Sequence, residues 1–174
     1  MILRGNQEEG GEEEFRKVIL GGSFDKLHKG HKFLLKSALK ISKKIKIGLV
    51  KDEILQDKPF SYQIEKFNIR KNKVISFLSE LDKNIRIDIV PISDPYGPSI
   101  EEYDITDIVV TEETVPRAVK INKIRTSRNL PKLRIHVVRL LLAEDGRVIR
   151  SSRIRAGEID GDGKLLVNKI KIKY

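Results

Sequence analysis

Two histidines three residues apart, His28 and His31, lie in the stretch GGSFDKLHKGHKFLL. The apolar spacing after them predicts a helix from about His31, and Gly30 lets the chain turn into that helix. Both imidazoles would then face one pocket. Donors at a helix N-terminus suit a transferring phosphoryl group, which mainly needs positioning and charge stabilisation. A metal site is a weaker interpretation because no third ligand is evident, and a helix cap without function is the remaining alternative.

The residues before the histidines also suit a phosphate. Gly21 and Gly22 follow a short apolar segment, and without side chains their backbone N–H groups can approach an anion closely. Ser23 can donate its hydroxyl to a phosphate oxygen, and we expect Asp25 to order the loop by accepting backbone N–H groups. The stretch is neither a Walker A loop nor a GxGxxG motif, so those two phosphate-binding motifs are not supported.

The elements that must position these residues alternate along the chain. We expect strands over residues 16–20, Lys44–Val50, 85–92, 106–111 and 133–143, and helices over 31–42, 62–81, 113–128 and from Ser151 onward. A C-terminal strand in LLVNKIKIKY could follow the turn DGDG. This order predicts a single α/β domain, a Rossmann-like open and mostly parallel sheet with helices on both faces. Ligands bind such sheets at the carboxyl ends of the strands, near the topological switch point.

Polar residues cluster at those predicted strand ends. Thr111 and Glu112 end the fourth strand, and Arg125 on the following helix could reach a phosphate, with a surface salt bridge as the alternative. Ser151 and Ser152 begin the last helix, where hydroxyls and free N–H groups converge on an anion. Arg155 lies one turn further and could grip a β- or γ-phosphate oxygen in bidentate fashion, although an ordinary cap with surface arginines is the alternative.

Composition sets the outer bounds. The 174 residues suit one domain with a sizeable core, and we assign residues 15–174 to it. Residues 1–14 carry five glutamates and one arginine and are expected to form an acidic, flexible arm. There is no cysteine, no apolar run of the roughly 20 residues that span a membrane, and no basic leader, which predicts a soluble cytoplasmic protein. The charged, isoleucine-rich composition is typical of thermophiles.

The net charge of +10 favours a polyanionic partner, either nucleic acid or a phosphorylated small molecule. An RNA-binding module would need an aromatic platform. Aromatic residues make up only 6% of the chain, and no RNP-like or KH-like motif is present. We therefore expect no nucleic-acid partner.

The motifs together resemble a known family. GGSFDKLHKGHKFLL resembles the signature of the HxGH nucleotidyltransferase superfamily, in which the two histidines contact ATP phosphates. VVTEETVPRAVKINKIRTSRNLPKL, IRSSRIRAGEID and DPYGP are similar to segments of its phosphopantetheine adenylyltransferases of the archaeal and eukaryotic type. The chain departs from that pattern at Ser23, where the family usually has threonine, and at Arg150 and Asn129, which replace a serine and a glycine.

The resemblance implies adenylyl transfer from ATP, with Mg²⁺ carried by the nucleotide, to 4′-phosphopantetheine in coenzyme A synthesis. Nicotinamide mononucleotide, FMN and glycerol phosphate are alternative acceptors, and the TEET…INKIR segment favours phosphopantetheine. The oligomeric state stays open, and no metal ligand is expected on the protein. The expected catalytic residues are His28, His31 and Ser23. The expected ATP-binding residues are Gly21, Gly22, Ser23, Phe24, Asp25, His28, Gly30, His31, Thr111, Glu112, Arg125, Ser151, Ser152 and Arg155. The acceptor is expected to contact Ser23, Lys51, Lys58 and Asp94, and the sequence leaves open which lysine holds its phosphate.

The arm yields a first prediction. Its sequence buries too little apolar surface to offset the entropy of ordering, so deleting residues 2–13 should leave turnover and melting temperature nearly unchanged. If the glutamates instead covered the basic pocket, the truncated protein would bind ATP more tightly, most clearly at low salt. Nucleotide titration of both proteins at two ionic strengths distinguishes the two outcomes. A large loss of stability on truncation would contradict both.

Overall fold

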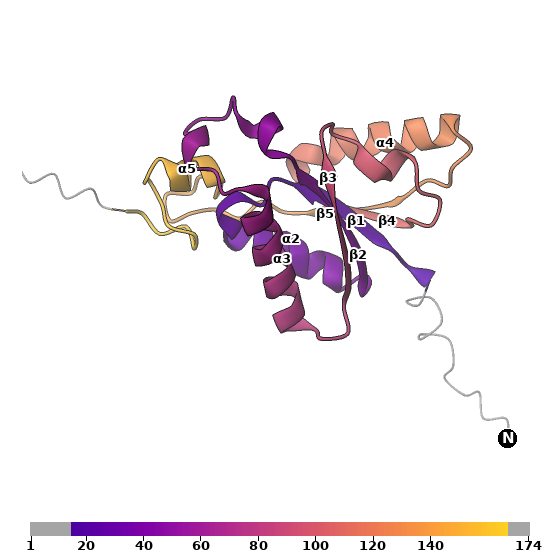
Figure 1. Cartoon of the computed structure of the whole chain (residues 1–174), viewed down its shortest axis with the longest axis horizontal. Helices are drawn as coiled ribbons and strands as arrows, with labels where there is room; N and C mark the ends of the chain where they lie inside the picture. Colours follow the sequence, from indigo (N-terminus) through magenta and orange to yellow (C-terminus); the bar gives the residue numbers. More distant parts are fainter. Residues whose placement is uncertain (1–14, 167–174) are drawn as a thin grey trace, which may run out of the picture.

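The computed structural model describes residues 15–166 (Figure 1). The strands are β1 (Val18–Gly22), β2 (Lys44–Val50), β3 (Arg86–Ile92), β4 (Asp107–Thr111) and β5 (Arg134–Val138). The α-helices are α2 (Lys29–Leu39), α3 (Phe67–Leu81), α4 (Val115–Ser127) and α5 (Ser151–Arg155). Short 3₁₀ turns complete the connections: η1 (Asp25–Leu27), η2 (Asp52–Leu55), η3 (Ser61–Gln63), η4 (Gly97–Ile100) and η5 (Glu112–Thr114). No helix in this part of the chain is long and apolar enough to cross a membrane.

The five strands form one parallel sheet in the order β3-β2-β1-β4-β5. The predicted α/β class is therefore confirmed, and the strand order reverses between β1 and β4. Strands β1 and β2 pair along five positions, whereas β1 and β4 pair only at Val18–Asp107 and Ile19–Ile108. Beyond those two pairs the carboxyl halves of β1 and β4 separate, which opens the sheet at its switch point.

Apolar side chains from alternate positions of the strands form a core on each face of the sheet. On one face, Leu20 and Ile47 pack with Leu35 of α2 and Leu78 of α3. On the other face, Ile108 and Val110 pack with Ile121 of α4. Figure 1 shows α2 and α3 on one side of the sheet and α4 on the other. Both faces are thus covered by helices, as a parallel sheet requires.

Several element boundaries differ from the sequence expectations. Strand β1 runs two residues further than predicted, so Gly21 and Gly22 are its last two residues. Helix α3 starts at Phe67 after a separate 3₁₀ turn, and β5 ends at Val138, five residues earlier than expected. The acidic arm and most of the predicted C-terminal strand lie outside the described residues.

A buried carboxylate at the amino end of β4 ties three segments together. Asp107 is fully buried and accepts hydrogen bonds from the Arg16 guanidinium (Nε, 3.1 Å) and the Thr106 hydroxyl (2.7 Å). The Nε2 atom of His136 on β5 lies 2.6 Å from the same carboxylate. Burial alone would raise the pKa of Asp107, but these donors, led by Arg16, hold it at about 2. The carboxylate joins the start of β1 to β4 and β5.

Asp107→Asn should lower the free energy of unfolding at pH 7 by about 3 kcal/mol, because it removes the buried negative charge that Arg16 and its neighbours are arranged around. A carboxyl whose folded-state pKa is depressed stabilises the fold above its unfolded value of 3.8, and the contribution is lost as pH falls toward 2. The difference between wild type and mutant should therefore shrink between pH 4 and pH 2 in urea titrations. Asp104→Asn, at a carboxylate that is 68% exposed, is the matched control and should change little.

Candidate active site

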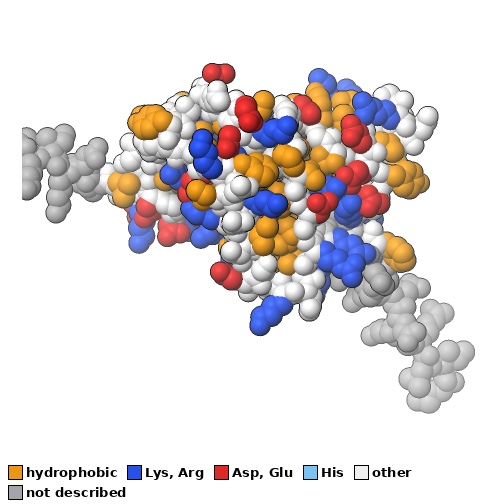
Figure 2. All heavy atoms as spheres, viewed as in Figure 1, with side chains coloured by type: hydrophobic (Ala, Val, Ile, Leu, Met, Phe, Trp, Pro, Cys, Tyr) orange, Lys and Arg blue, Asp and Glu red, His pale blue; other side chains and the backbone are white. Residues whose placement is uncertain are grey.

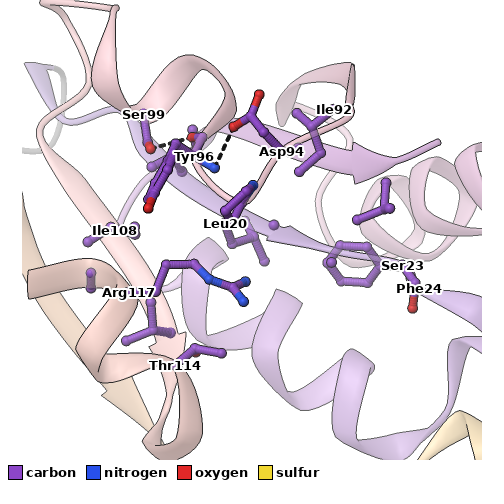
Figure 3. A pocket seen from close by; sticks show the side chains of 18 of the residues that line it. Leu20, Ser23, Phe24, Ile92, Asp94, Tyr96, Ser99, Ile108, Thr114 and Arg117 are labelled. Atoms are coloured by element: carbon purple, nitrogen blue, oxygen red, sulfur yellow. Dashed lines mark hydrogen bonds between the residues drawn. The ribbon is translucent and has the colours of Figure 1, made fainter. Parts of the chain in front are cut away.

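The separation of β1 and β4 leaves a pocket of about 500 Å³ at the carboxyl edge of the sheet (Figure 3). This volume lies in the range that holds small-molecule ligands. The pocket is lined by the ends of the central strands and by the segments that follow them. Its residues include Gly21, Gly22, Ser23, Phe24, His31, Ile54, Lys58, Ile92, Asp94, Tyr96, Thr111, Thr114 and Arg117.

The loop after β1 has a fixed and strained backbone. Phe24 has the left-handed conformation with φ of 49°, and its ring is completely buried. A Cβ atom on Gly22 would lie 3.2 Å from that ring, a tight contact that glycine avoids. Non-glycine residues in this conformation cost free energy, and they persist where surrounding packing holds them. Packing of the Phe24 ring thus holds the loop that presents Ser23 to the pocket.

His28 is the N-cap of α2. Its Nδ1 atom accepts hydrogen bonds from the N–H groups of Gly30 (3.2 Å) and His31 (3.4 Å), so Nε2 carries the proton. A Cβ atom on Gly30 would lie 3.1 Å from the His28 ring. Glycine at this position leaves room for the imidazole, and Gly30 lies inside α2, which begins at Lys29 and not at His31 as expected. Burial lowers the pKa of His28 to about 4, despite the nearby negative charge of Asp25.

His31 lines the pocket, and His28 stacks behind it with ring centroids 3.8 Å apart. The Nδ1 atom of His31 is buried and has no hydrogen-bond partner within residues 15–166. A buried polar atom without a partner is unfavourable, so a bound ligand that supplies the partner would be stabilised. Burial holds the pKa of His31 well below its ordinary value, and His28 and Lys58 lower it further. Both imidazoles are thus neutral near pH 7 and act as hydrogen-bonding groups.

The two candidate lysines lie in different places. Lys58 lines the pocket, whereas Lys51 is exposed and does not. Desolvation and the neighbouring Arg155 charge lower the pKa of Lys58, while Asp25 raises it. Asp94 also lines the pocket, but its carboxylate accepts the N–H groups of Tyr96 and Gly97 (both 2.8 Å) and so shapes the turn around itself. The geometry favours Lys58 over Lys51 for contact with an anion.

Asp25 and α5 lie beside the pocket and are bonded to each other. Asp25 is buried, and its carboxylate accepts the N–H of Glu65 (2.9 Å) and the guanidinium of Arg155. Ser151 donates its hydroxyl to the Asp25 carbonyl (2.8 Å). Neither serine of α5 lines the pocket, and Arg155 is buried in its ion pair, so the structure differs from the expected open set of phosphate ligands.

Arg125 is placed away from the pocket. Its guanidinium is fully buried and donates to the backbone carbonyls of Pro131, Ser99, Glu102 and Ile105 at 2.6 to 3.4 Å. Asn122, one turn earlier, bonds both the N–H and the carbonyl of Leu133. The segment INKIR therefore holds α4 against neighbouring backbone, and the expectation that Arg125 reaches a phosphate is wrong for this geometry. At the end of β4, Thr111 lines the pocket but Glu112 does not.

The sequence reasoning missed Arg117 and Tyr96. Figure 3 shows Arg117 extending from α4 into the pocket near Thr114, with Tyr96 and Asp94 on another wall. The position of Arg117 in the first turn of the helix after TEET was the available signal, because side chains at the start of a helix that follows a parallel strand lie at the ligand-binding edge.

On the face drawn in Figure 2, lysine and arginine side chains are mixed with acidic ones and form no single basic patch.

Comparisons with known proteins agree with this geometry. Residues 19–157 match the family model described as cytidylyltransferase-like, and the chain belongs to that family. Relatives with curated names show which enzymes of the family the chain resembles most. A phosphopantetheine adenylyltransferase of Methanopyrus kandleri is 41% identical over 146 residues, which cover 84% of this chain and 92% of that one. Another, from Methanosarcina barkeri, is 39% identical over 155 residues, covering 87% and 94%.

Among solved structures, a protein of unknown function from Archaeoglobus fulgidus superimposes with a TM-score of 0.61 at 34% identity, covering 70% of this chain and 88% of that one. The identities to the Methanopyrus kandleri and Methanosarcina barkeri enzymes place the chain with the phosphopantetheine adenylyltransferases, as the motifs indicated.

Two arginines of α4 yield a paired prediction. Arg117→Met should weaken ATP binding about 10- to 100-fold, from the roughly 1.5–3 kcal/mol of a charge-assisted hydrogen bond, and leave stability nearly unchanged. Arg125→Met should lower the free energy of unfolding by more than about 3 kcal/mol, because it leaves several buried carbonyls without donors. Calorimetric titration and urea unfolding of both variants test the pair. A stable Arg125→Met protein with weak ATP binding would contradict the structural role.

Proposed function

We propose that this chain transfers the adenylyl group of ATP to the 4′-phosphate of phosphopantetheine, giving dephospho-coenzyme A and pyrophosphate. The observation that carries the proposal is the buried Nδ1 of His31, which has no hydrogen-bond partner among the described residues and belongs to a side chain that lines the pocket at the switch point of the sheet. Ser23 and Lys58 lie along the same pocket, and Arg117 enters it from α4. These are hydrogen-bonding and cationic groups suited to two phosphate-bearing substrates.

The reaction needs alignment and charge stabilisation more than proton transfer. An oxygen of the acceptor phosphate attacks the α-phosphorus of ATP in line, a new P–O bond forms, and the bond to the bridging α–β oxygen breaks. The electron pair leaves with pyrophosphate. Because the attacking phosphate oxygen is already anionic, no general base is required. Holding both substrates in one pocket can supply much of the rate enhancement.

The pocket contains a neutral hydrogen-bonding group and positively charged groups, which would stabilise the phosphates in different ways. The neutral imidazole of His31 offers a fixed hydrogen bond in a desolvated site, where such bonds are strongest. His28, stacked behind it, restricts the ring. Positive charge comes from Lys58 and Arg117, which reach the pocket from different segments. Mg²⁺ enters as the metal complex of ATP, since magnesium keeps several waters and needs few protein ligands.

The acceptor is the part of the proposal that needs its own test. Aliphatic side chains such as Ile54, Leu55 and Ile92 line part of the pocket and suit a flexible acyclic chain better than a second nucleotide ring. Pyrophosphate release should be measured with ATP, Mg²⁺ and one acceptor at a time: 4′-phosphopantetheine, nicotinamide mononucleotide, FMN or glycerol 3-phosphate. Turnover with phosphopantetheine alone supports the proposal, and faster turnover with another acceptor would replace it.

His31→Ala should lower kcat about 10²–10³-fold, the usual loss when one preorganised donor to a developing charge is removed. The fold should be retained, because Nδ1 makes no hydrogen bond to any part of the chain that the structure describes. Lys32→Ala, at the next and exposed position of α2, is the matched control and should keep normal turnover. A folded His31→Ala protein with near-normal kcat would remove His31 from the mechanism.

A further inference from the structure

Exposed lysines form a row along α2 and its C-cap, and we call them the lysine row: Lys29, Lys32, Lys36 and Lys40. Successive members are three or four residues apart, so their side chains lie on one face of the helix, where like charges repel each other. The sequence has no acidic residue between Asp25 and Asp52 that could interrupt the row. The row is therefore a concentrated positive surface.

The neighbouring helix does not neutralise this charge. Two ammonium groups of the row, those of Lys32 and Lys36, lie 5.7 and 5.9 Å from the centroid of the Phe77 ring on α3, which gives only a weak attraction at an exposed site. The Asp82 carboxylate at the end of α3 is paired with Lys43 at 3.0 Å, outside the row. Among the described residues, no carboxylate forms an ion pair with a lysine of the row.

The first described residues lie beside the end of this row. The Ser42 hydroxyl, two residues after Lys40, donates to the carbonyl of Arg16 (2.5 Å) and accepts the N–H of Lys44 (2.9 Å). The turn after α2 is thus held against the residue that follows Phe15. Residues 1–14 are joined to the chain at this point, so the acidic arm starts next to the lysine row.

The arm has the complementary charge and enough length to follow the row. Its acidic residues are Glu8, Glu9, Glu12, Glu13 and Glu14. They lie within seven residues of Phe15, and an extended chain of that length spans roughly 24 Å. The 11 residues of α2 span only about 16 Å. The glutamates can therefore reach the whole row, and their covalent attachment gives them a high effective concentration there.

We propose that the glutamates of the arm dock on the lysine row of α2 and mask it from other polyanions. The contact consists of interchangeable exposed ion pairs, which contribute little to stability. In the described part of the chain, no lysine of the row lines the active-site pocket. Deletion of residues 2–13 can therefore expose the row and still leave turnover and melting temperature nearly unchanged. The docking is independent of the reaction that the pocket catalyses.

A spin label on the arm locates it directly. Because the chain has no cysteine, Gly10→Cys gives a single site for a nitroxide among the glutamates. At low salt the label should broaden the backbone amide signals of residues 29–43, and added salt should reverse the broadening by screening the charges. Replacing all five glutamates by glutamine should abolish it. The absence of salt-dependent broadening in α2, or broadening of pocket residues 21–24 and 54–58 instead, would overturn the proposal.

Charge reversal tests whether the row itself is the docking surface. In the labelled protein, Lys36→Glu combined with Lys40→Glu should abolish the broadening of α2. The matched control combines Lys123→Glu with Lys132→Glu, which reverses two exposed lysines on and after α4 and changes the net charge equally. The control should keep the broadening. An equal loss in both double variants would show attraction to net charge alone and would overturn the assignment to α2.

Binding of a single-stranded oligouridylate at low salt measures whether the row is masked. Deletion of residues 2–13 should tighten this binding about 10-fold, because the arm no longer competes for the same lysines. Lys36→Glu with Lys40→Glu should remove the gain in the truncated protein. A full-length protein that binds the RNA as tightly as the truncated one would overturn the masking and would assign the surface to nucleic acid.

Discussion

The Asp25 carboxylate is the interaction on which the site depends most. A buried charge is stable only when paired and hydrogen-bonded, and this one is satisfied by Arg155 from α5 and by the backbone of Glu65. Ser151 adds a bond to the carbonyl of the same residue. The buried charge of Asp25 is therefore compensated only when three distant parts of the chain come together around the loop after β1. The loop that carries Ser23 and the histidines is thus fixed by contacts made after residue 150.

Arg70 of α3 supports the same loop. Its buried guanidinium donates to the carbonyls of Ser23 (2.6 Å) and Val50 (2.8 Å) and to the Asp52 carboxylate (2.7 Å). It therefore links the carboxyl ends of β1 and β2. Together with Arg125, which holds backbone behind the pocket wall, it shows that the buried arginines serve the chain's own carbonyls. Within residues 15–166, Arg117 and Lys58 are the arginine and lysine that line the pocket.

Much of the fold was predictable because apolar residues that become buried recur along the sequence with the period of a helix or a strand. Strand β2 matched its predicted bounds, since its alternating, β-rich sequence has the period of a strand. The spacing of the histidines predicted that both imidazoles face one pocket, but only His31 lines it, whereas His28 caps α2 and stacks against His31. The roles of the arginines were not predictable, because a guanidinium can pair with an anion, a carboxylate or a carbonyl, and the sequence does not say which backbone lies beside it. Arg125 and Arg155 were therefore assigned to phosphates, and Arg117 was overlooked.

The location of the pocket follows from strand pairing. Parallel strands that remained paired to their ends would close the sheet edge, and side chains from both faces would fill the gap. Here β1 and β4 share two register positions and then diverge, so Gly21, Gly22 and Thr111 face a cavity instead of each other. The divergence is held open by Arg70 and Asp25 on the β1 side and by the Thr111–Thr114 capping box on the β4 side. The missing side chains at both glycines then leave backbone at the strand ends facing the cavity, where its N–H groups can approach a ligand closely.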